Sequence, residues 1–277
     1  MPANPSALFD VRAARRARAR ARALDGDRFL ERAAAEGLVD RLSAVTRGFS
    51  RALWIGDAVP PDIAPFAGSW ACAEFSQDEA LAADGPFDLA VSLYSLQWIN
   101  DLPGALLQIR RLLKPDGLFV GALLGGNTLQ ELREAFAQGE IATRGGVSPR
   151  VAPFADVRDL GGLLQRAGFA LPVADVERLT VRYGDFFDLV RDLRAHGLTN
   201  VLTERSRGAL RRDTLAALLA HYAARHADGD GKLRASFETL YLTGWAPDES
   251  QQKPLQPGSA KMRLAEALKT QERPLKA

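Results

Sequence analysis

The chain has 277 residues, 47% of them hydrophobic and 25% charged, which is the composition of an ordinary globular protein with room for a full core. Its 36 cationic and 34 acidic residues leave a formal charge of +2, too small to attract nucleic acid or anionic lipid globally. One cysteine, Cys72, excludes a disulfide framework, and three histidines argue against a metal centre, so we expect no metal site. No apolar run approaches the roughly 20 residues that span a bilayer.

Arginine is concentrated at the start of the chain. Six arginines interleaved with alanine lie between Arg12 and Arg22, a pattern typical of a mitochondrial transit peptide or of a basic helix in the fold. Asp10 stands directly before this run, and helical apolar spacing over 28–42 follows without a linker, so we favour the helix. Residues 1–48 are therefore predicted to form a helical arm. No aromatic platform accompanies the arginines, so nucleic-acid binding is not expected.

From residue 49 the pattern alternates between strands and helices, which indicates a parallel α/β sheet. The predicted core covers 49–184, a helical insertion covers 185–230, and the last strand and a tail cover 231–277. The residues Thr128-Leu-Gln-Glu131 predict a capping box at the start of a helix. The predicted strands are 51–55, 70–75, 87–92, 118–124, 176–183 and 237–245, and the predicted helices include 101–113, 128–136, 160–167 and two or more within 185–226.

The segment Phe87-Asp-Leu-Ala-Val-Ser-Leu-Tyr-Ser-Leu-Gln-Trp-Ile-Asn-Asp-Leu-Pro103, followed by Leu112-Leu-Lys-Pro-Asp-Gly117, resembles the fourth and fifth strands of class I S-adenosylmethionine-dependent methyltransferases. The resemblance implies a Rossmann-like class I methyltransferase sheet and the cofactor S-adenosyl-L-methionine. It places the methionine end of that cofactor against the end of the fourth strand. The residues implied there are Ser92, Leu93 and Tyr94 for the cofactor, with Gln97, Trp98 and Asn100 for the substrate.

Four further segments recur together in one family, which contains the mitochondrial complex I assembly factor 5 and its bacterial homologues. Malonyl-carrier-protein methyltransferases of biotin synthesis are more distantly similar. The mitochondrial member of the family is described as an arginine hydroxylase, whereas the bacterial members are generally called methyltransferases. The recurring segments are Phe9-Asp10 with the arginine arm, Gln97–Pro103, Gly125–Arg133, and Gly244–Pro247 with Ser250–Pro254 and Pro257–Ala260.

The sequence departs from the family pattern after the first strand. The family places several glycines there so that the backbone can approach the cofactor, but here Gly56 is followed by Asp57 and then by prolines. Phe87 comes only 31 positions after Gly56, although the complete fold needs roughly 40 or more positions there for its strands and crossovers. At least one βα unit is therefore missing. Segment 70–75 is either the second strand, with Glu74 as the ribose acid, or the third, with Asp78 near the adenine.

The resemblance favours an S-adenosylmethionine-dependent methyltransferase acting on a protein, such as a respiratory complex I subunit or an assembly intermediate. Two alternatives stay open: a non-enzymatic assembly factor with a degenerate cofactor site, and a protein-arginine hydroxylase. No motif in the sequence identifies a catalytic base, and no two-histidine–carboxylate spacing indicates a site for an oxygen-activating metal. His196, beside Gly197, is interpreted as the end of a helix. The expected location is the bacterial cytoplasm, with the mitochondrial matrix as the alternative.

Overall fold

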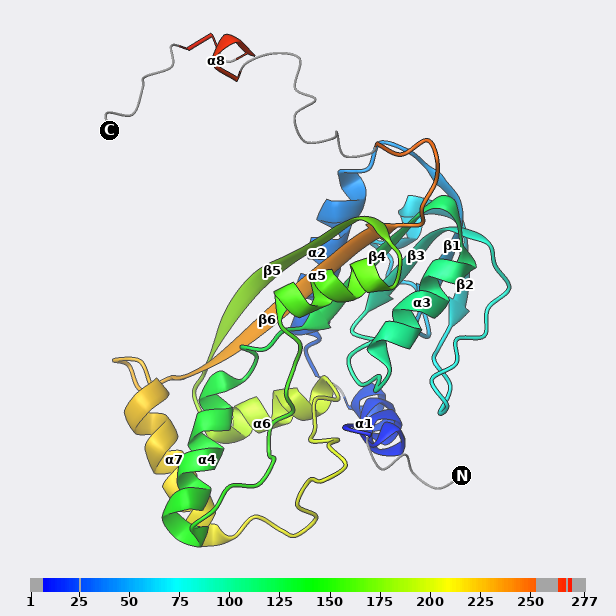
Figure 1. The fold of residues 1–277 in the computed structure, drawn as a ribbon. Helices are drawn as coiled ribbons and strands as arrows, with labels where there is room; N and C mark the ends of the chain where they lie inside the picture. The colour runs from blue at the N-terminus through cyan, green and yellow to red at the C-terminus, as the bar shows by residue number, and fades with distance from the viewer. Residues whose placement is uncertain (1–6, 25, 253–263, 268, 271–277) are drawn as a thin grey trace. The chain divides into compact units, whose positions relative to one another are not determined.

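The computed structural model describes residues 7–24, 26–252, 264–267 and 269–270. Residues 1–247 form one compact unit, and residues 248–277 form a second unit. The first unit is built on a six-stranded sheet with the order β2-β1-β3-β4-β6-β5 (Figure 1). β1 to β4 run parallel, whereas β6 is antiparallel to both of its neighbours. The strands are β1 (Phe49–Ile55), β2 (Ala67–Ala73), β3 (Phe87–Leu93), β4 (Leu113–Leu124), β5 (Ala170–Tyr183) and β6 (Leu233–Trp245).

Helices cover both faces of the sheet, as the alternating pattern predicted. Leu106 of α3 and Leu164 of α5 pack on one face, while Leu38 and Leu42 of α2 pack on the other. The helices are α1 (Val11–Ala23), α2 (Phe29–Ser43), α3 (Leu102–Leu112), α4 (Gln130–Arg144), α5 (Val157–Arg166), α6 (Phe186–Ala195), α7 (Arg212–His226) and α8 (Leu264–Ala267), with a 3-10 turn η1 (Ala64–Phe66). No helix among the described residues is long and apolar enough to cross a bilayer.

The half of the sheet that begins with β1 is shortened, as the residue count predicted. Residues 56–86, all of which the structure describes, hold only η1 and β2. β2 pairs with β1 and has no second neighbour, so it is the edge of the sheet. The segment around Trp70 is therefore the second strand, and the strand that would flank it is absent from this part of the chain. Glu74 follows the end of β2 directly.

The basic arm is a helix of the fold. The carboxylate of Asp10 accepts a hydrogen bond from the backbone N of Ala13 at 2.9 Å and so caps α1. The small buried face of α1, which includes Ala14 and Ala17, lets the helix approach Trp98 closely. Before the helix, the backbone N and O of Phe9 bond the side chain of Asn100 at 2.8 and 3.2 Å. These contacts pack the arginine-rich helix against the rest of the first unit.

The predicted capping box at residues 128–131 is wrong. Leu129 occupies the N-cap position of α4 in a left-handed conformation with φ 55°, and no side chain caps the helix. The hydroxyl of Thr128 instead accepts from the backbone N of Glu238 at 3.0 Å, and Glu131 accepts from Ser236. Both predicted cap residues are buried, and they satisfy β6 rather than the helix end. Residues 253–263, which include part of the segments that recur in the family, lie outside the described residues.

A glycine in α2 and a buried carboxylate in α4 each hold their helix in place. A Cβ at Gly37 of α2 would lie 2.1 Å from the hydroxyl oxygen of Tyr241, so only glycine lets α2 pack on β6 here. In α4, the side chain of Glu140 is 1% exposed and accepts hydrogen bonds from the backbone N of Ser148 at 2.6 Å and from Nε of Arg150 at 2.8 Å. Burial alone raises the pKa of Glu140, but these hydrogen bonds and the charge of Arg150 outweigh it and hold that pKa below its ordinary value.

Candidate functional site

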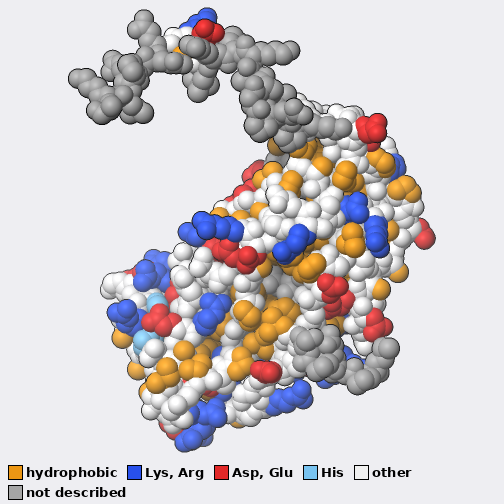
Figure 2. All heavy atoms as spheres, viewed as in Figure 1, with side chains coloured by type: hydrophobic (Ala, Val, Ile, Leu, Met, Phe, Trp, Pro, Cys, Tyr) orange, Lys and Arg blue, Asp and Glu red, His pale blue; other side chains and the backbone are white. Residues whose placement is uncertain are grey.

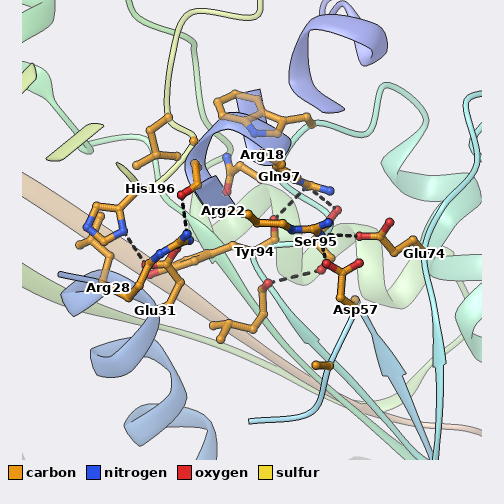
Figure 3. Close-up of a pocket in the computed structure, with 18 of the residues that line it drawn as sticks. Arg18, Arg22, Arg28, Glu31, Asp57, Glu74, Tyr94, Ser95, Gln97 and His196 are labelled. Atoms are coloured by element: carbon orange, nitrogen blue, oxygen red, sulfur yellow. Dashed lines mark hydrogen bonds and ion pairs between the residues drawn. The ribbon is translucent and has the colours of Figure 1, made fainter. Parts of the chain in front are cut away.

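A pocket of about 330 Å³ lies at the carboxyl ends of β1, β2 and β3. The carboxyl ends of parallel strands meet at one edge of a sheet, where doubly wound folds bind their ligands. Side chains from α1 and α2 complete the wall of the pocket (Figure 3). The arm and the shortened half of the sheet therefore meet at the same place.

Two carboxylates stand at the ends of adjacent strands. Asp57 comes two residues after β1, and Glu74 comes directly after β2. Arg22 of α1 forms an ion pair with both of them, and its contact with Glu74 measures 3.3 Å (Figure 3). The three side chains remain 37–52% exposed, so solvent screens the pairs and a ligand can compete with them.

Gly56 brings the backbone of the β1 loop close to the pocket. A Cβ at this position would lie 2.7 Å from Nε1 of Trp54, which is closer than side chains tolerate. The backbone N of Gly56 donates to the carbonyl of Ala73 at 2.9 Å, which continues the β1–β2 pairing by one residue. One glycine thus opens the pocket wall where the family pattern uses several.

Three hydrogen-bonded polar side chains, half-buried or buried, follow the end of β3. Tyr94 has a left-handed backbone with φ 52°, and its hydroxyl lies 2.8 Å from Oγ1 of Thr239. Burial raises the pKa of Tyr94 well above its usual range, so this phenol stays neutral. The hydroxyl of Ser95 donates to the carbonyl of Ile55 at 2.5 Å and ties β3 to β1. The side-chain oxygen of Gln97 accepts from the backbone N of Leu124 at 2.6 Å, so the amide is fixed in place.

Guanidinium groups form the opposite wall of the pocket. Arg18 of α1 donates to the carbonyls of Tyr94 and Ser95 at 3.3 and 3.2 Å. Burial lowers the pKa of Arg18, while the nearby carboxylates of Glu74 and Asp57 oppose that shift. Arg22 and Arg28 also line the pocket, which therefore offers both cations and carboxylates to a ligand.

His196 and Glu31 form a bonded pair at one side of the pocket. Nδ1 of His196 lies 2.5 Å from Oε2 of Glu31, and only 2% of the histidine side chain is exposed (Figure 3). Burial raises the pKa of Glu31, but the hydrogen bond and charge of His196 outweigh it, so the pKa lies below its ordinary value. His196 follows the end of α6, as expected, yet it also lines the pocket.

The structure brings most of the predicted site residues together. Asp78 is exposed and lies outside the pocket, Ser92 is buried within the sheet with no partner for its hydroxyl, and Asn100 anchors the arm. Sequence reasoning missed the arginines, Glu31 and His196, because only tertiary packing carries α1, α2 and the end of α6 to this edge. It also missed Ser95, which directly follows the predicted Tyr94. The predicted residues that line the pocket are Gly56, Asp57, Glu74, Leu93, Tyr94, Gln97 and Trp98.

Comparison with known proteins identifies the family to which the chain belongs. A family model described as "Methyltransferase domain" matches residues 7–172, which is more than half of the chain. The chain belongs to the methyltransferase domain family. The crystal structure of the YcgJ protein from Bacillus subtilis superposes with a TM-score of 0.50 at 12% identity, covering 77% of this chain and 99% of that one. At that identity the likeness concerns the fold alone.

Two kinds of curated relative align with part of the chain. "Arginine-hydroxylase NDUFAF5, mitochondrial" from Danio rerio is 42% identical over 186 residues, covering 67% of this chain and 58% of the relative. "Malonyl-[acyl-carrier protein] O-methyltransferase" from Laribacter hongkongensis is 37% identical over 187 residues, covering 68% of this chain and 60% of the relative. The chain thus spans less than two thirds of either relative.

Proposed function

We propose that this protein binds S-adenosylmethionine in the pocket at the ends of β1 to β3 and transfers its methyl group to a protein. The observation that carries the proposal is the pair of carboxylates, Asp57 and Glu74, at adjacent strand ends of a methyltransferase-family sheet. The cofactor has a ribose diol, an ammonium group and a carboxylate, and it supplies an electrophilic methyl group on sulfur.

The residues present fit those groups. Glu74 follows the second strand and would accept from the ribose hydroxyls. The wall at the exit of β3, with Tyr94 and Gln97, would hold the methionine end. The half-buried Arg18 donates to the carbonyls of Tyr94 and Ser95 at that exit and would bind the cofactor carboxylate. Methyl transfer depends mainly on the alignment of the two reactants, so this rigid hydrogen-bonded wall contributes by positioning.

Calorimetry with S-adenosylmethionine and with its demethylated product tests cofactor binding. We expect both ligands to bind with one site per chain. Folded protein that gives no heat with either ligand at concentrations far above the protein would refute the proposal. The Gly56→Val variant should lose binding, because its side chain would enter the space now held by Trp54. The Gly162→Val variant is the matched control, since a Cβ there meets no atom within 4 Å.

The acceptor is proposed to be a subunit or assembly intermediate of respiratory complex I. Support comes from the resemblance to the complex I assembly factor family and from the 42% identical relative named an arginine hydroxylase. Mass spectrometry of complex I peptides, with and without the gene, tests this. A mass increase of one CH2 unit, in which a methyl group replaces a hydrogen, supports methyl transfer. An increase of one oxygen atom supports hydroxylation, the activity in the name of that relative.

A second candidate function is non-enzymatic assembly. The missing βα unit favours it, because the nucleoside half of the pocket has lost a supporting strand. The double variant Asp57→Asn, Glu74→Gln separates the two functions in a strain that lacks the gene. Restored assembly by a stable variant that no longer binds S-adenosylmethionine supports scaffolding. Failure of the same variant supports a role for the cofactor.

A further inference from the structure

A cluster of metal-ligating side chains lies away from the pocket. His221 and His226 come from the last two turns of α7, and Glu134 comes from the facing side of α4. Nε2 of His221 lies 3.1 Å from one carboxylate oxygen of Glu134, and Nε2 of His226 lies 3.2 Å from the other. One ligand atom from each residue falls within 4.8 Å of the other two. We propose that Glu134, His221 and His226 bind a divalent transition-metal ion such as Zn²⁺.

The donor set suits such an ion. Two imidazole nitrogens and one carboxylate are the protein ligands of many zinc sites and of some iron(II) sites. Zn–N and Zn–O bonds of about 2.1 Å in a tetrahedral site separate ligand atoms by about 3.4 Å. The two contacts of Glu134 are already near that spacing, so small side-chain rotations would place all three donors around one ion. The cluster is thus preformed by the packing of α4 against α7.

One of the three proposed metal-ligating side chains has a ring nitrogen without a hydrogen-bond partner. Nε2 of His226 is buried and makes no hydrogen bond, although Glu134 is close, because the geometry between the two groups is unsuitable. A buried polar atom without a partner is rare, and a bound ion would satisfy it.

The surroundings leave room for further ligands. A cavity of about 420 Å³ adjoins the cluster, and Glu134 and His226 belong to its wall. None of its lining residues belongs to the wall of the proposed cofactor pocket, so the two sites are separate. Arg234 also lines the cavity, but its guanidinium pairs with Asp228 at 3.3 Å, which offsets part of its charge. Figure 2 shows histidine side chains reaching the surface among charged groups over the part of the molecule that α4 and α7 form in Figure 1.

The spacing of Glu134, His221 and His226 along the chain does not indicate a metal site. His221 and His226 are five residues apart, which places them about 140° apart around an ideal helix rather than on one face. His226 is the last residue of α7, and its ring packs edge-on against Tyr222 at 5.5 Å between ring centroids. The third donor lies 87 residues earlier in the chain. The expectation of no metal site, based on the small number of histidines, did not anticipate that two of the three lie together.

Zn²⁺ titration of the full, untagged chain tests the proposal, because a histidine tag would itself bind the ion. We expect one equivalent of Zn²⁺ to bind the wild type and Arg225→Gln, whose exposed side chain lies on the same helix. Glu134→Gln, His221→Gln and His226→Gln should each bind at least about tenfold more weakly, since even outer-shell changes weaken metal sites tenfold or more. At one Zn²⁺ concentration the unfolding temperature should rise more for the wild type than for these three variants.

Nuclear magnetic resonance of the imidazole groups provides an independent readout, because the chain has only three histidines. Zn²⁺ should shift the resonances of His221 and His226 and leave those of His196, which is held by Glu31, unchanged. Equal Zn²⁺ affinity in the wild type and the three ligand variants would overturn the proposal. A shift confined to His196 would also overturn it, as would the absence of binding to correctly folded wild-type protein.

Discussion

Replacing Glu74 by glutamine tests whether the end of β2 is the ribose subsite. Hydrogen bonds to a charged group contribute about 1.5–3 kcal/mol. Part of this binding free energy is offset in the wild type, because Glu74 must first break its exposed ion pair with Arg22. That ion pair contributes at most about 1 kcal/mol. The expected net loss is about 1–2 kcal/mol, so Glu74→Gln should bind S-adenosylmethionine roughly five to thirty times more weakly. Calorimetry of wild type and variant measures this directly.

The matched control is Asp78→Asn, which removes the other acid that the sequence offered. Asp78 is exposed and outside the pocket, so its loss should change affinity by no more than about twofold. Arg22→Ala should tighten binding by at most about fivefold, because it frees both carboxylates from a solvent-exposed pair. A large loss in Asp78→Asn together with unchanged binding in Glu74→Gln would refute the assignment of the ribose subsite.

Three further predictions concern stability and the arm. Gly37→Ala should lower the free energy of unfolding in urea by about 1–3 kcal/mol, because its Cβ would overlap the hydroxyl of Tyr241 in β6. The control Gly162→Ala should be neutral or slightly stabilising. Equal effects of the two substitutions would contradict the packing argument. Glu140 has a lowered pKa in the folded state, so its stabilisation is present above the ordinary glutamate pKa of about 4.3 and is lost as pH falls through the folded-state value. Glu140→Gln should therefore show a smaller loss of stability between neutral and acid pH than wild type, and identical pH profiles would count against this role. Asn100→Ala should release the backbone of Phe9 and speed limited proteolysis of the arm, and an unchanged cleavage rate would show that other contacts hold it.

Much of the fold could be read from local patterns. The segments that begin at Phe87 and Leu118 are mostly apolar, and they form the buried centre of the sheet. The small residue count after Gly56 also predicted the missing unit, because chain length limits how many elements can be built. Local pattern does not predict the start of α4, because Thr128 and Glu131 have the residue types of a capping box but bond to β6, which lies far along the chain.

The sequence by itself determined the sheet, the shortened first half, the basic arm and the residues at the strand ends, because each depends on spacing along a short stretch of chain. Only the tertiary structure decided that the second strand ends at Ala73, directly before Glu74, and that Arg22 pairs with both pocket carboxylates. It alone placed two histidines of α7 against Glu134 of α4. The physical reason is the same in each case: these contacts join segments far apart in the sequence, and helix packing rather than local periodicity sets which side chains meet.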